Sequence, residues 1–421
     1  MRTPRILIVV NVYPPDQCGG AVIFGDLSQG LAERGYDVTV RCAYPYYPEW
    51  TDKSGQNSLK ISRYEERGVH VERFGLYIPR HPNSLAERML YEFSFFASLA
   101  RKQHDVPPFD GVMVFCPLVG AVAYAALYGK RNNIPVWLNV QDLPADAAAA
   151  GGIASQGKTT HLLQAVQQWL FNQTDIWSSI SPQMVKRLQT MTRRGQPVYL
   201  LPNWLHRSLY TAIQQLDVHR PRHLHRPVRL FYSGNIGSKQ DLLAFCQTLH
   251  KSTAPFVFRI HGEGSEAPAL RRWIQTSGDS RFLWGGFLEE SAYIRHLFES
   301  DFLVVTEKTG SGGSFIPSKI IPAMAAGVPI LAVSDADSPL GREMHRVEPG
   351  PWFSWDDLPQ LLEWLRDIPE ERYLYWHRRA LARAAFYDRE HMLDRYEQVL
   401  QQLLKRNPTW ANLHTTPTEI R

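Results

Sequence analysis

The chain contains a pattern of short apolar runs alternating with longer amphipathic stretches, and this pattern occurs twice. Near the N-terminus, the run Ile6–Val12 is followed by Phe24–Arg34, where Leu27 and Leu31 are spaced as on one face of a helix. A second apolar run, Val38–Arg41, comes next. A strand, a helix and a further strand in this order form a βαβ unit, in which the two strands lie parallel in one sheet. We therefore predict an α/β fold with a parallel sheet covered by helices.

The same alternation continues to about residue 201 and restarts near residue 230. In the first half, the further predicted strands are Val69–Phe74, Val112–Phe115, Val136–Val140, Ile176–Ile180 and Val198–Leu201, with helices at Leu85–Gln103 and His161–Leu170. In the second half, the strands are Leu230–Tyr232, Phe256–Ile260, Phe282–Trp284, Phe302–Thr306 and Pro329–Val333, with helices at Leu242–His250, Ala269–Gln275 and Pro317–Ala326. Residues 111–129 are uncharged and apolar, but Pro117 and Gly120 interrupt them, so we interpret them as a strand and a helix rather than a membrane span.

Two such patterns in 421 residues predict two Rossmann-like domains. We expect an N-terminal domain at residues 1–216, a linker rich in proline and cations at 217–229, and a C-terminal domain at 230–380. A long charged helical pattern ends the chain. We expect its last part, 381–406, to pack back towards the N-terminal domain, and residues 407–421 to form a loose tail. The carboxyl ends of the two predicted sheets are the expected ligand site.

Charge and cysteine content narrow the function classes. The net charge is only +5, from 46 Lys and Arg against 41 Asp and Glu, so a dedicated nucleic-acid binder is disfavoured. The four cysteines lie far apart without CxxC spacing, which is typical of reduced thiols in a cytoplasmic protein. Histidines are frequent in 219–227, but arginines interleave with them and would repel a cation. We predict no metal site.

Glycine-rich loops follow the first predicted strand of each domain. Gly19 and Gly20 precede a helix, where free backbone N–H groups can bind an anion. Gly234, Asn235 and Lys239 occupy the mirrored position in the second domain, and the lysine supplies a flexible charge for a phosphate. Neither loop matches GxGxxG or GxxxxGK[ST], which disfavours a nicotinamide dehydrogenase and a Walker-type ATPase.

A third glycine-rich loop lies between two predicted strands of the second domain. It contains Gly313 and Ser314 and leads into a helix whose first turn carries Ser318 and Lys319. The helix dipole, a hydroxyl and an ammonium can then converge on a diphosphate without a metal ion. In the first domain, Asp142 follows a predicted strand and is expected at the ligand edge, although capping of a helix explains it equally well.

The order of short motifs resembles the GT-B glycosyltransferases of family 4, especially the exopolysaccharide and colanic-acid type, over residues 1 to about 400. The motifs are Tyr13-Pro14-Pro15 with Gly19-Gly20, Pro45 to Trp50, Gln141 to Pro144, Ile180 to Met184, Leu201 to Trp204, Tyr232 to Gly237 with Lys239-Gln240, and Pro317 to Lys319 with Ala325 to Pro329.

The resemblance implies a GT-B enzyme that transfers a sugar, with retention, from a nucleotide-sugar donor held mainly by the C-terminal domain to a glycan or lipid-linked acceptor. It implies that Lys239 stabilises the leaving diphosphate and that Gly286 and Phe287 lie near the base, and no metal cofactor is required. With the loops above, the expected donor-binding residues are Gly19, Gly20, Gly234, Asn235, Lys239, Gly286, Phe287, Gly313, Ser314, Ser318 and Lys319, and the catalytic candidates are Lys239 and Asp142.

The chain also departs from the family pattern. The family's paired glutamates fall on Ser314 and Pro322, and the arginine that usually precedes the lysine becomes Asn235. Glu307 and Glu263 are carboxylates nearby without an assigned role. These changes leave the sugar, the base and the acceptor open. They also leave two alternatives to an active transferase, namely a non-catalytic relative that binds a partner or nucleotide sugar, and a sugar-nucleotide epimerase.

Residues 80–104 combine apolar and aromatic side chains with Arg80, Arg88, Arg101 and Lys102. Such a stretch fits a helix packed on a core, and it also fits an amphipathic helix resting on an anionic membrane. We therefore expect a cytoplasmic protein, bound peripherally to the inner face of the membrane if the second interpretation holds.

Overall fold

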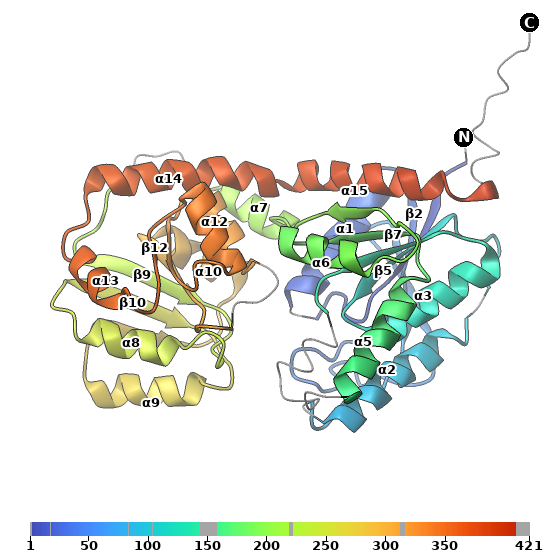
Figure 1. Cartoon of the computed structure of the whole chain (residues 1–421), viewed down its shortest axis with the longest axis horizontal. Coiled ribbons are helices and arrows are strands. Elements are labelled where there is room, and N and C mark those ends of the chain that lie inside the picture. The colour runs from blue at the N-terminus through green and yellow to red at the C-terminus, as the bar shows by residue number, and fades with distance from the viewer. Residues whose placement is uncertain are drawn as a thin grey trace, which may run out of the picture. The chain divides into compact units, whose positions relative to one another are not determined.

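The computed structural model describes residues 2–16, 18–82, 84–102, 104–143, 158–218, 222–311 and 316–409. The chain divides into two compact units. Unit 1 comprises Met1–Pro202 with Met392–Arg421, and unit 2 comprises Asn203–His391. Figure 1 labels their elements.

Unit 1 is built on an eight-stranded sheet of order β3-β4-β2-β1-β5-β6-β7-β8 within the described residues. Its strands are β1 (Arg5–Val9), β2 (Asp37–Ala43), β3 (Ser62–Glu66), β4 (Val69–Phe74), β5 (Gly111–Cys116), β6 (Val136–Val140), β7 (Ile176–Ser179) and β8 (Val198–Leu200). All neighbours are parallel except β3 and β4. The sequence analysis missed β3, because its residues are polar and mostly exposed at the sheet edge and show no apolar run.

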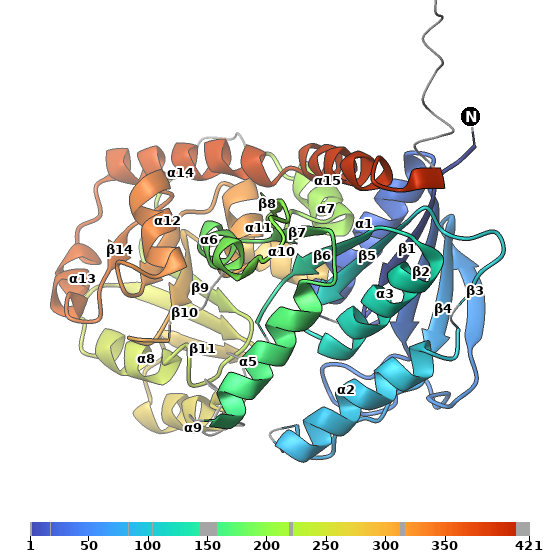
Figure 2. The ribbon, with the colours of Figure 1, turned by 45° about the vertical axis from the view of Figure 1, so that its right-hand side comes forward.

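Helices cover both faces of this sheet. They are α1 (Gly19–Glu33), α2 (Leu85–Leu99), α3 (Val119–Asn132), α5 (Lys158–Phe171), α6 (Pro182–Met191) and α15 (Arg389–Leu404). Both α2 and α5 contact α3, and the three helices lie on one side of the sheet (Figures 1 and 2). Residues 111–129 form β5 and the start of α3, as predicted. Among the described helices, none has the length and hydropathy to cross a bilayer.

A buried ion network joins β2 and β4 to the segment after α2. The guanidinium of Arg41, fully buried on β2, donates to Glu72 at 2.8 Å and to Asp105 at 2.6 Å. The ammonium of Lys102 pairs with the same two carboxylates. These partners hold the pKa of Glu72 and Asp105 below their usual range, against the opposing effect of burial. Lys102 is therefore engaged in ion pairs within unit 1.

Unit 2 is built on a six-stranded parallel sheet of order β11-β10-β9-β12-β13-β14 in its described part. The strands are β9 (Val228–Ser233), β10 (Phe256–His261), β11 (Phe282–Gly285), β12 (Phe302–Thr306), β13 (Ile330–Val333) and β14 (Trp352–Phe353). The helices are α7 (Arg207–Gln214), α8 (Leu242–His250), α9 (Ala267–Ser277), α10 (Glu290–Phe298), α11 (Ile320–Ala325), α12 (Pro339–Val347), α13 (Leu358–Trp364) and α14 (Glu370–Ala384).

The boundary between the units differs from the expected one at residue 216. Helix α7 contacts α10 and α11, and the side chains of Leu205 and Ile213 are buried in the core of unit 2. Packing of this short amphipathic helix decides where the unit begins, whereas the sequence pattern shows only the position of the next strand. Unit 2 therefore starts after Pro202.

The stretch expected as a solvated linker, 217–229, is packed against unit 2 where it is described. Arg222 donates to the carbonyl oxygens of Phe298 and Ser300, at 2.9 and 2.5 Å. His225 lies 2.8 Å from the buried carboxylate of Asp301. Cations suit this position because the carbonyl groups at the C-terminal end of a helix, here α10, carry partial negative charge. The composition of the segment therefore reflects its partners, and the prediction of an interdomain linker is wrong for residues 222–229.

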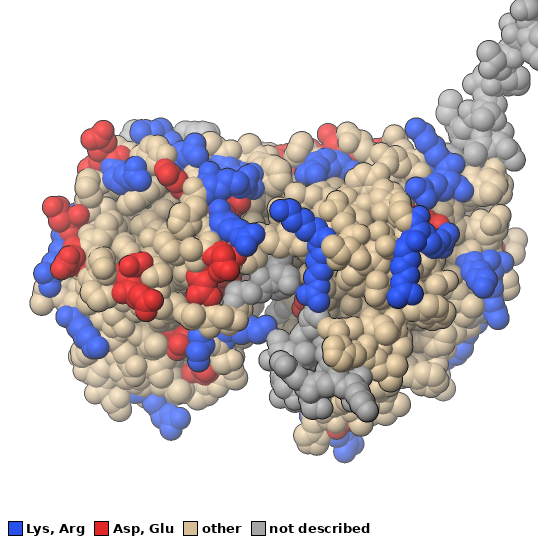
Figure 3. All heavy atoms as spheres, viewed as in Figure 1, with Lys and Arg blue, Asp and Glu red and all other residues tan. Residues whose placement is uncertain are grey.

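The charged pattern at the end of the chain forms two helices rather than one. Helix α14 belongs to unit 2, a 3₁₀ turn follows at Ala385–Tyr387, and most of α15 belongs to unit 1. Tyr396 of α15 packs on Trp137, with ring centroids 5.5 Å apart, and its hydroxyl accepts from Asn139 at 3.1 Å. On the face of the molecule shown in Figure 3, acidic and basic side chains mix over unit 2, whereas Lys and Arg prevail over unit 1.

Candidate functional site

The candidate donor site lies at the carboxyl ends of the strands of unit 2, where glycine loops meet. Gly234 follows β9, and Gly262 follows the neighbouring strand β10 with φ of +146°. A Cβ at Gly262 would lie 1.9 Å from the carbonyl oxygen of Gly234. The two loops therefore touch backbone to backbone, which requires glycine at position 262.

The loop after β12 fixes the position of the predicted phosphate lysine. The N–H of Lys308 donates to the carbonyl oxygen of Lys239 at 2.8 Å, and the Ser311 hydroxyl donates to the same oxygen at 3.0 Å. Thr306 donates to the carbonyl oxygen of Gln240 at 2.6 Å. The backbone of Lys239 is thus held on the sheet while its side chain stays exposed. This arrangement suits a long cation that reaches a ligand from the rim.

Lys319 lies at the same edge. It occupies the N-cap position of α11. Its ammonium lies 4.0 Å from the centre of the Tyr232 ring and 3.1 Å from the point where Gly234 would carry a Cβ. Burial lowers the pKa of Lys319 to about 8, and the nearby carboxylate of Glu307 acts in the opposite direction. A partly buried ammonium beside an open glycine backbone favours an anionic ligand at this position.

Glu307 places a carboxylate near Lys319, and the sequence pattern assigns no role to it. It follows β12 directly, and its Oε2 atom is buried without a hydrogen-bond partner. Burial raises the pKa of Glu307, whereas a hydrogen bond with the Ser338 side chain and the charge of Lys319 lower it. The main chain of Glu307 is fixed, because its carbonyl oxygen accepts from the Trp355 indole at 2.7 Å. The signal that could have found it is its position at the end of a strand facing the phosphate loops.

The other predicted donor residues lie at the same edge or outside the described residues. Gly286 follows β11, its carbonyl oxygen lies 3.0 Å from Nδ1 of His261, and the ring of Phe287 is 71% exposed. Asn235 and Ser318 are exposed. Gly313 and Ser314 lie outside the described residues.

The carboxyl edge of the sheet in unit 1 carries the remaining candidates. Gly19 and Gly20 form the first turn of α1, and a Cβ at Gly19 would meet no atom within 4 Å, so this turn is open to a ligand. Asp142 follows β6, and its Oδ1 accepts from the N–H of Leu143 at 2.8 Å. Capping of a helix by Asp142 would involve residues 144–157, which lie outside the described residues.

The same edge holds Glu92, a carboxyl group that the sequence analysis did not single out. It projects from α2 to the first turn of α3, where it accepts the N–H of Gly120 at 2.8 Å. Burial raises the pKa of Glu92 to about 7, so the group titrates near neutral pH. Nothing in the pattern of α2 distinguishes it from a surface glutamate.

Residues 19–204 match the family described as a glycosyl transferase 4-like domain. The match covers the greater part of unit 1 and less than half of the chain. The chain is similar, with 28% identity over 353 residues, to the putative colanic acid biosynthesis glycosyl transferase WcaI of Escherichia coli K12, covering 80% of this chain and 85% of that protein.

Solved structures share the fold of this chain over nearly its whole length. Sucrose-phosphate synthase from Thermosynechococcus elongatus is similar with a TM-score of 0.65 and 17% identity, covering 96% of this chain and 99% of that one. The Anabaena protein HepE, solved with UDP and glucose, gives a TM-score of 0.63 and 15% identity over 94% and 99% of the two chains. The two parallel-sheet domains expected from the sequence are thereby confirmed as a GT-B fold.

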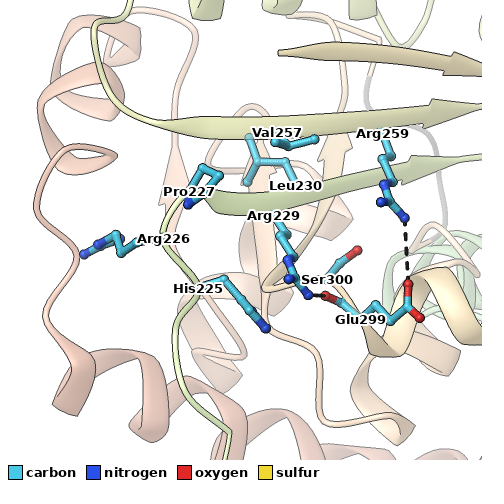
Figure 4. Close-up of a pocket in the computed structure, with 9 residues that line it drawn as sticks. All are labelled: His225, Arg226, Pro227, Arg229, Leu230, Val257, Arg259, Glu299 and Ser300. Atoms are coloured by element: carbon cyan, nitrogen blue, oxygen red, sulfur yellow. Dashed lines mark hydrogen bonds and ion pairs between the residues drawn. The ribbon is translucent and has the colours of Figure 1, made fainter. Parts of the chain in front are cut away.

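A pocket of unit 2 lies away from the candidate site. It has a volume of about 480 Å³ and is lined by Arg229 near the amino end of β9, by Val257 and Arg259 of β10, and by Glu299 at the end of α10 (Figure 4). The glycine loops lie at the opposite ends of the same strands. Within the described part of the chain, no group of three His, Cys, Asp or Glu side chains is placed to hold a metal ion.

Proposed function

We propose that the donor is a nucleoside diphosphate sugar bound at the carboxyl ends of β9, β10 and β12, and that the sugar passes with retention to a glycan or lipid-linked acceptor without a metal ion. The observation that carries this proposal is the partly buried Lys319 ammonium, which lies 4.0 Å from the centre of the Tyr232 ring and beside the backbone of Gly234. Binding of UDP and glucose by HepE supports a donor of this class.

The proposed chemistry places negative charge where these lysines lie. The bond between the anomeric carbon and the diphosphate oxygen breaks, and the oxygen of an acceptor hydroxyl forms the new bond to that carbon. The diphosphate leaves with additional negative charge, and the hydroxyl proton is released from the acceptor. The partly buried Lys319 and the exposed Lys239 stabilise the departing diphosphate electrostatically. In this proposal Gly234, Asn235 and Ser318 contribute polar groups to the diphosphate, and Gly286 and Phe287 bind the base.

The remaining candidates lie at the carboxyl edge of the sheet in unit 1. Gly19 and Gly20 stay candidates for donor binding through the open first turn of α1, and Asp142 stays a catalytic candidate. The similarity to WcaI supports an acceptor in polysaccharide or glycoconjugate synthesis. A cytoplasmic location with contact to an anionic membrane through residues 80–104 agrees with a lipid-linked acceptor.

A second candidate is a non-catalytic relative that binds a nucleotide sugar or a partner. The observation in its favour is Pro322, which replaces a family glutamate and is buried inside α11, where no carboxylate can be supplied from that position. Such a protein would bind donor without turnover. The epimerase alternative has no observation in its favour.

The test is nucleotide binding by calorimetry with UDP, GDP, ADP and their sugar conjugates, with and without EDTA, followed by assay of donor turnover. We expect one base to bind independently of EDTA. Lys319→Met should weaken binding by about tenfold or more, because hydrogen bonds to charged groups contribute roughly 1.5–3 kcal/mol. Lys251→Met, which removes an exposed cation at the end of α8, is the matched control. Absence of binding to every nucleotide would contradict the proposal, and binding without turnover would favour the second candidate.

A further inference from the structure

Helix α2 turns an apolar face to solvent. Met89, Leu90 and Phe93 are 55%, 47% and 65% exposed, and Ala86 and Ala97 are exposed on either side of them. These positions follow the spacing of a single helical stripe. A helix that only packed on the core would carry polar residues there.

Helix α5 shows the same feature. Leu162, Val166 and Trp169 are 64%, 44% and 56% exposed, and they share one face with the exposed Ala165. The polar Gln167 is 4% exposed and faces the interior instead. The usual arrangement of a surface helix is thus reversed in α5.

The two apolar faces belong to neighbouring parts of unit 1. Both helices contact α3 and cover the same side of the sheet (Figure 2). Among the described residues, eleven large apolar side chains are exposed, and six of them lie on these two helices. Because isolated apolar side chains on a surface are normal but gathered ones mark an interaction site, this concentration points to a partner. We refer to Met89, Leu90, Phe93, Leu162, Val166 and Trp169 as the α2–α5 apolar surface.

The charged side chains on and beside α2 and α5 indicate which kind of partner fits this surface. The two carboxylates of α2 are engaged within unit 1, since Glu87 accepts the N–H groups of Arg80 and His81 and Glu92 accepts that of Gly120. Helix α5 contains no Asp or Glu. Arg80 and Arg101 are exposed at the two ends of α2. Apolar faces with flanking cations and without free carboxylates match an anionic lipid surface.

We propose that the α2–α5 apolar surface docks unit 1 on an anionic lipid bilayer, with Trp169 and Phe93 at the level of the headgroups. This extends the expected contact beyond residues 80–104, because α5 supplies half of the surface. It also removes Lys102 from the contact, since that ammonium is paired with Glu72 and Asp105. The inference rests on the proposed function only in so far as a membrane-bound protein would reach a lipid-linked acceptor.

The test is flotation of the full chain with vesicles of phosphatidylcholine, with and without phosphatidylglycerol. We expect the chain to float with the anionic vesicles at low salt and to dissociate as salt is raised. The variant Phe93→Ser/Trp169→Ser should bind these vesicles about tenfold or more weakly, because two large apolar groups are lost from the contact. The control Leu59→Ser/Val106→Ser removes side chains that are 75% and 98% exposed elsewhere in unit 1, and it should float like the wild type.

Three results would overturn the inference. They are a wild-type chain that floats with neither vesicle, a Phe93/Trp169 variant that floats like the wild type, and a wild-type dimer in light scattering that this variant converts to monomer without vesicle binding. Thermal unfolding of both variants shows whether the fold is kept. Nucleotide binding measured on the same samples separates the two proposals, because failure to bind nucleotide leaves the vesicle result unaffected.

Discussion

Replacing Lys319 should stabilise the protein and weaken donor binding at the same time. Its ammonium is held against the Tyr232 ring and beside Gly234, and burial lowers its pKa from 10.5 to about 8. Each pKa unit is worth about 1.4 kcal/mol, so the charged form is disfavoured in the folded state by about 3 kcal/mol. The side chain is partly exposed as a whole, which makes this an upper limit. We expect Lys319→Met to raise the free energy of unfolding at pH 7 by roughly 1–3 kcal/mol.

The pH dependence follows from the direction of the shift. The pKa of Lys319 is lower in the folded state than in the unfolded state, so the unfolded chain holds more protons between pH 8 and pH 10.5. The contribution of Lys319 to the free energy of unfolding therefore becomes more favourable as pH rises through this window, and the Met variant lacks this change. A bound diphosphate favours the ammonium form, so the donor should bind with uptake of protons near pH 8.

The assay combines urea unfolding between pH 7 and 10 with calorimetry in buffers of different ionisation enthalpy. Lys239→Met is the matched comparison, because that side chain is exposed and its loss should change stability by less than about 0.5 kcal/mol while still weakening donor binding. A Lys319→Met protein that is less stable at pH 7 and binds nucleotide like the wild type would refute the reasoning, since the ammonium would then be a structural contact.

Two further predictions concern groups at the sheet edges. Burial raises the pKa of Glu92 to about 7, so the stability that the neutral carboxyl group contributes is lost as pH rises from 4.5 to 7. In urea unfolding, Glu92→Gln should match the wild type at pH 5 and be more stable than the wild type at pH 8 by roughly 1–3 kcal/mol. Gly262→Ala should lower the free energy of unfolding by roughly 2–4 kcal/mol in the same assay, because its Cβ would lie 1.9 Å from the carbonyl oxygen of Gly234, whereas Gly286→Ala meets no atom within 4 Å and should be nearly neutral.

Most of the fold could be predicted from the sequence because buried parallel strands read as continuous apolar runs. β4, β6 and β12 have the predicted bounds, and β1 is shorter than the run that predicted it. The edge strand β3 could not be predicted because it carries no apolar run, and the short amphipathic helix α7 does not reveal by its own pattern which unit it packs on. Both depend on tertiary packing that a local pattern does not contain.

The candidate donor site was predictable in its glycine loops and less so in its side chains. Gly234 and Lys319 stand at strand and helix ends, where a sequence pattern marks them. The environment of Lys319 depends on the Tyr232 ring beneath it and on Gly234 beside it, and these approach it only in the folded unit. The raised pKa of Glu92 likewise comes from burial between two helices that are distant in sequence.

The loss of the family glutamates does not empty the donor edge of carboxylates. Pro322 is buried within α11 and can offer no hydrogen bond to a sugar hydroxyl. Glu307, at the end of β12, has a buried Oε2 without a partner and lies close enough to Lys319 for each to affect the pKa of the other. An unsatisfied carboxylate oxygen beside a partly buried ammonium costs free energy. A ligand that brings both a hydroxyl group and a phosphate would satisfy both groups together, which is the combination that a nucleotide sugar carries.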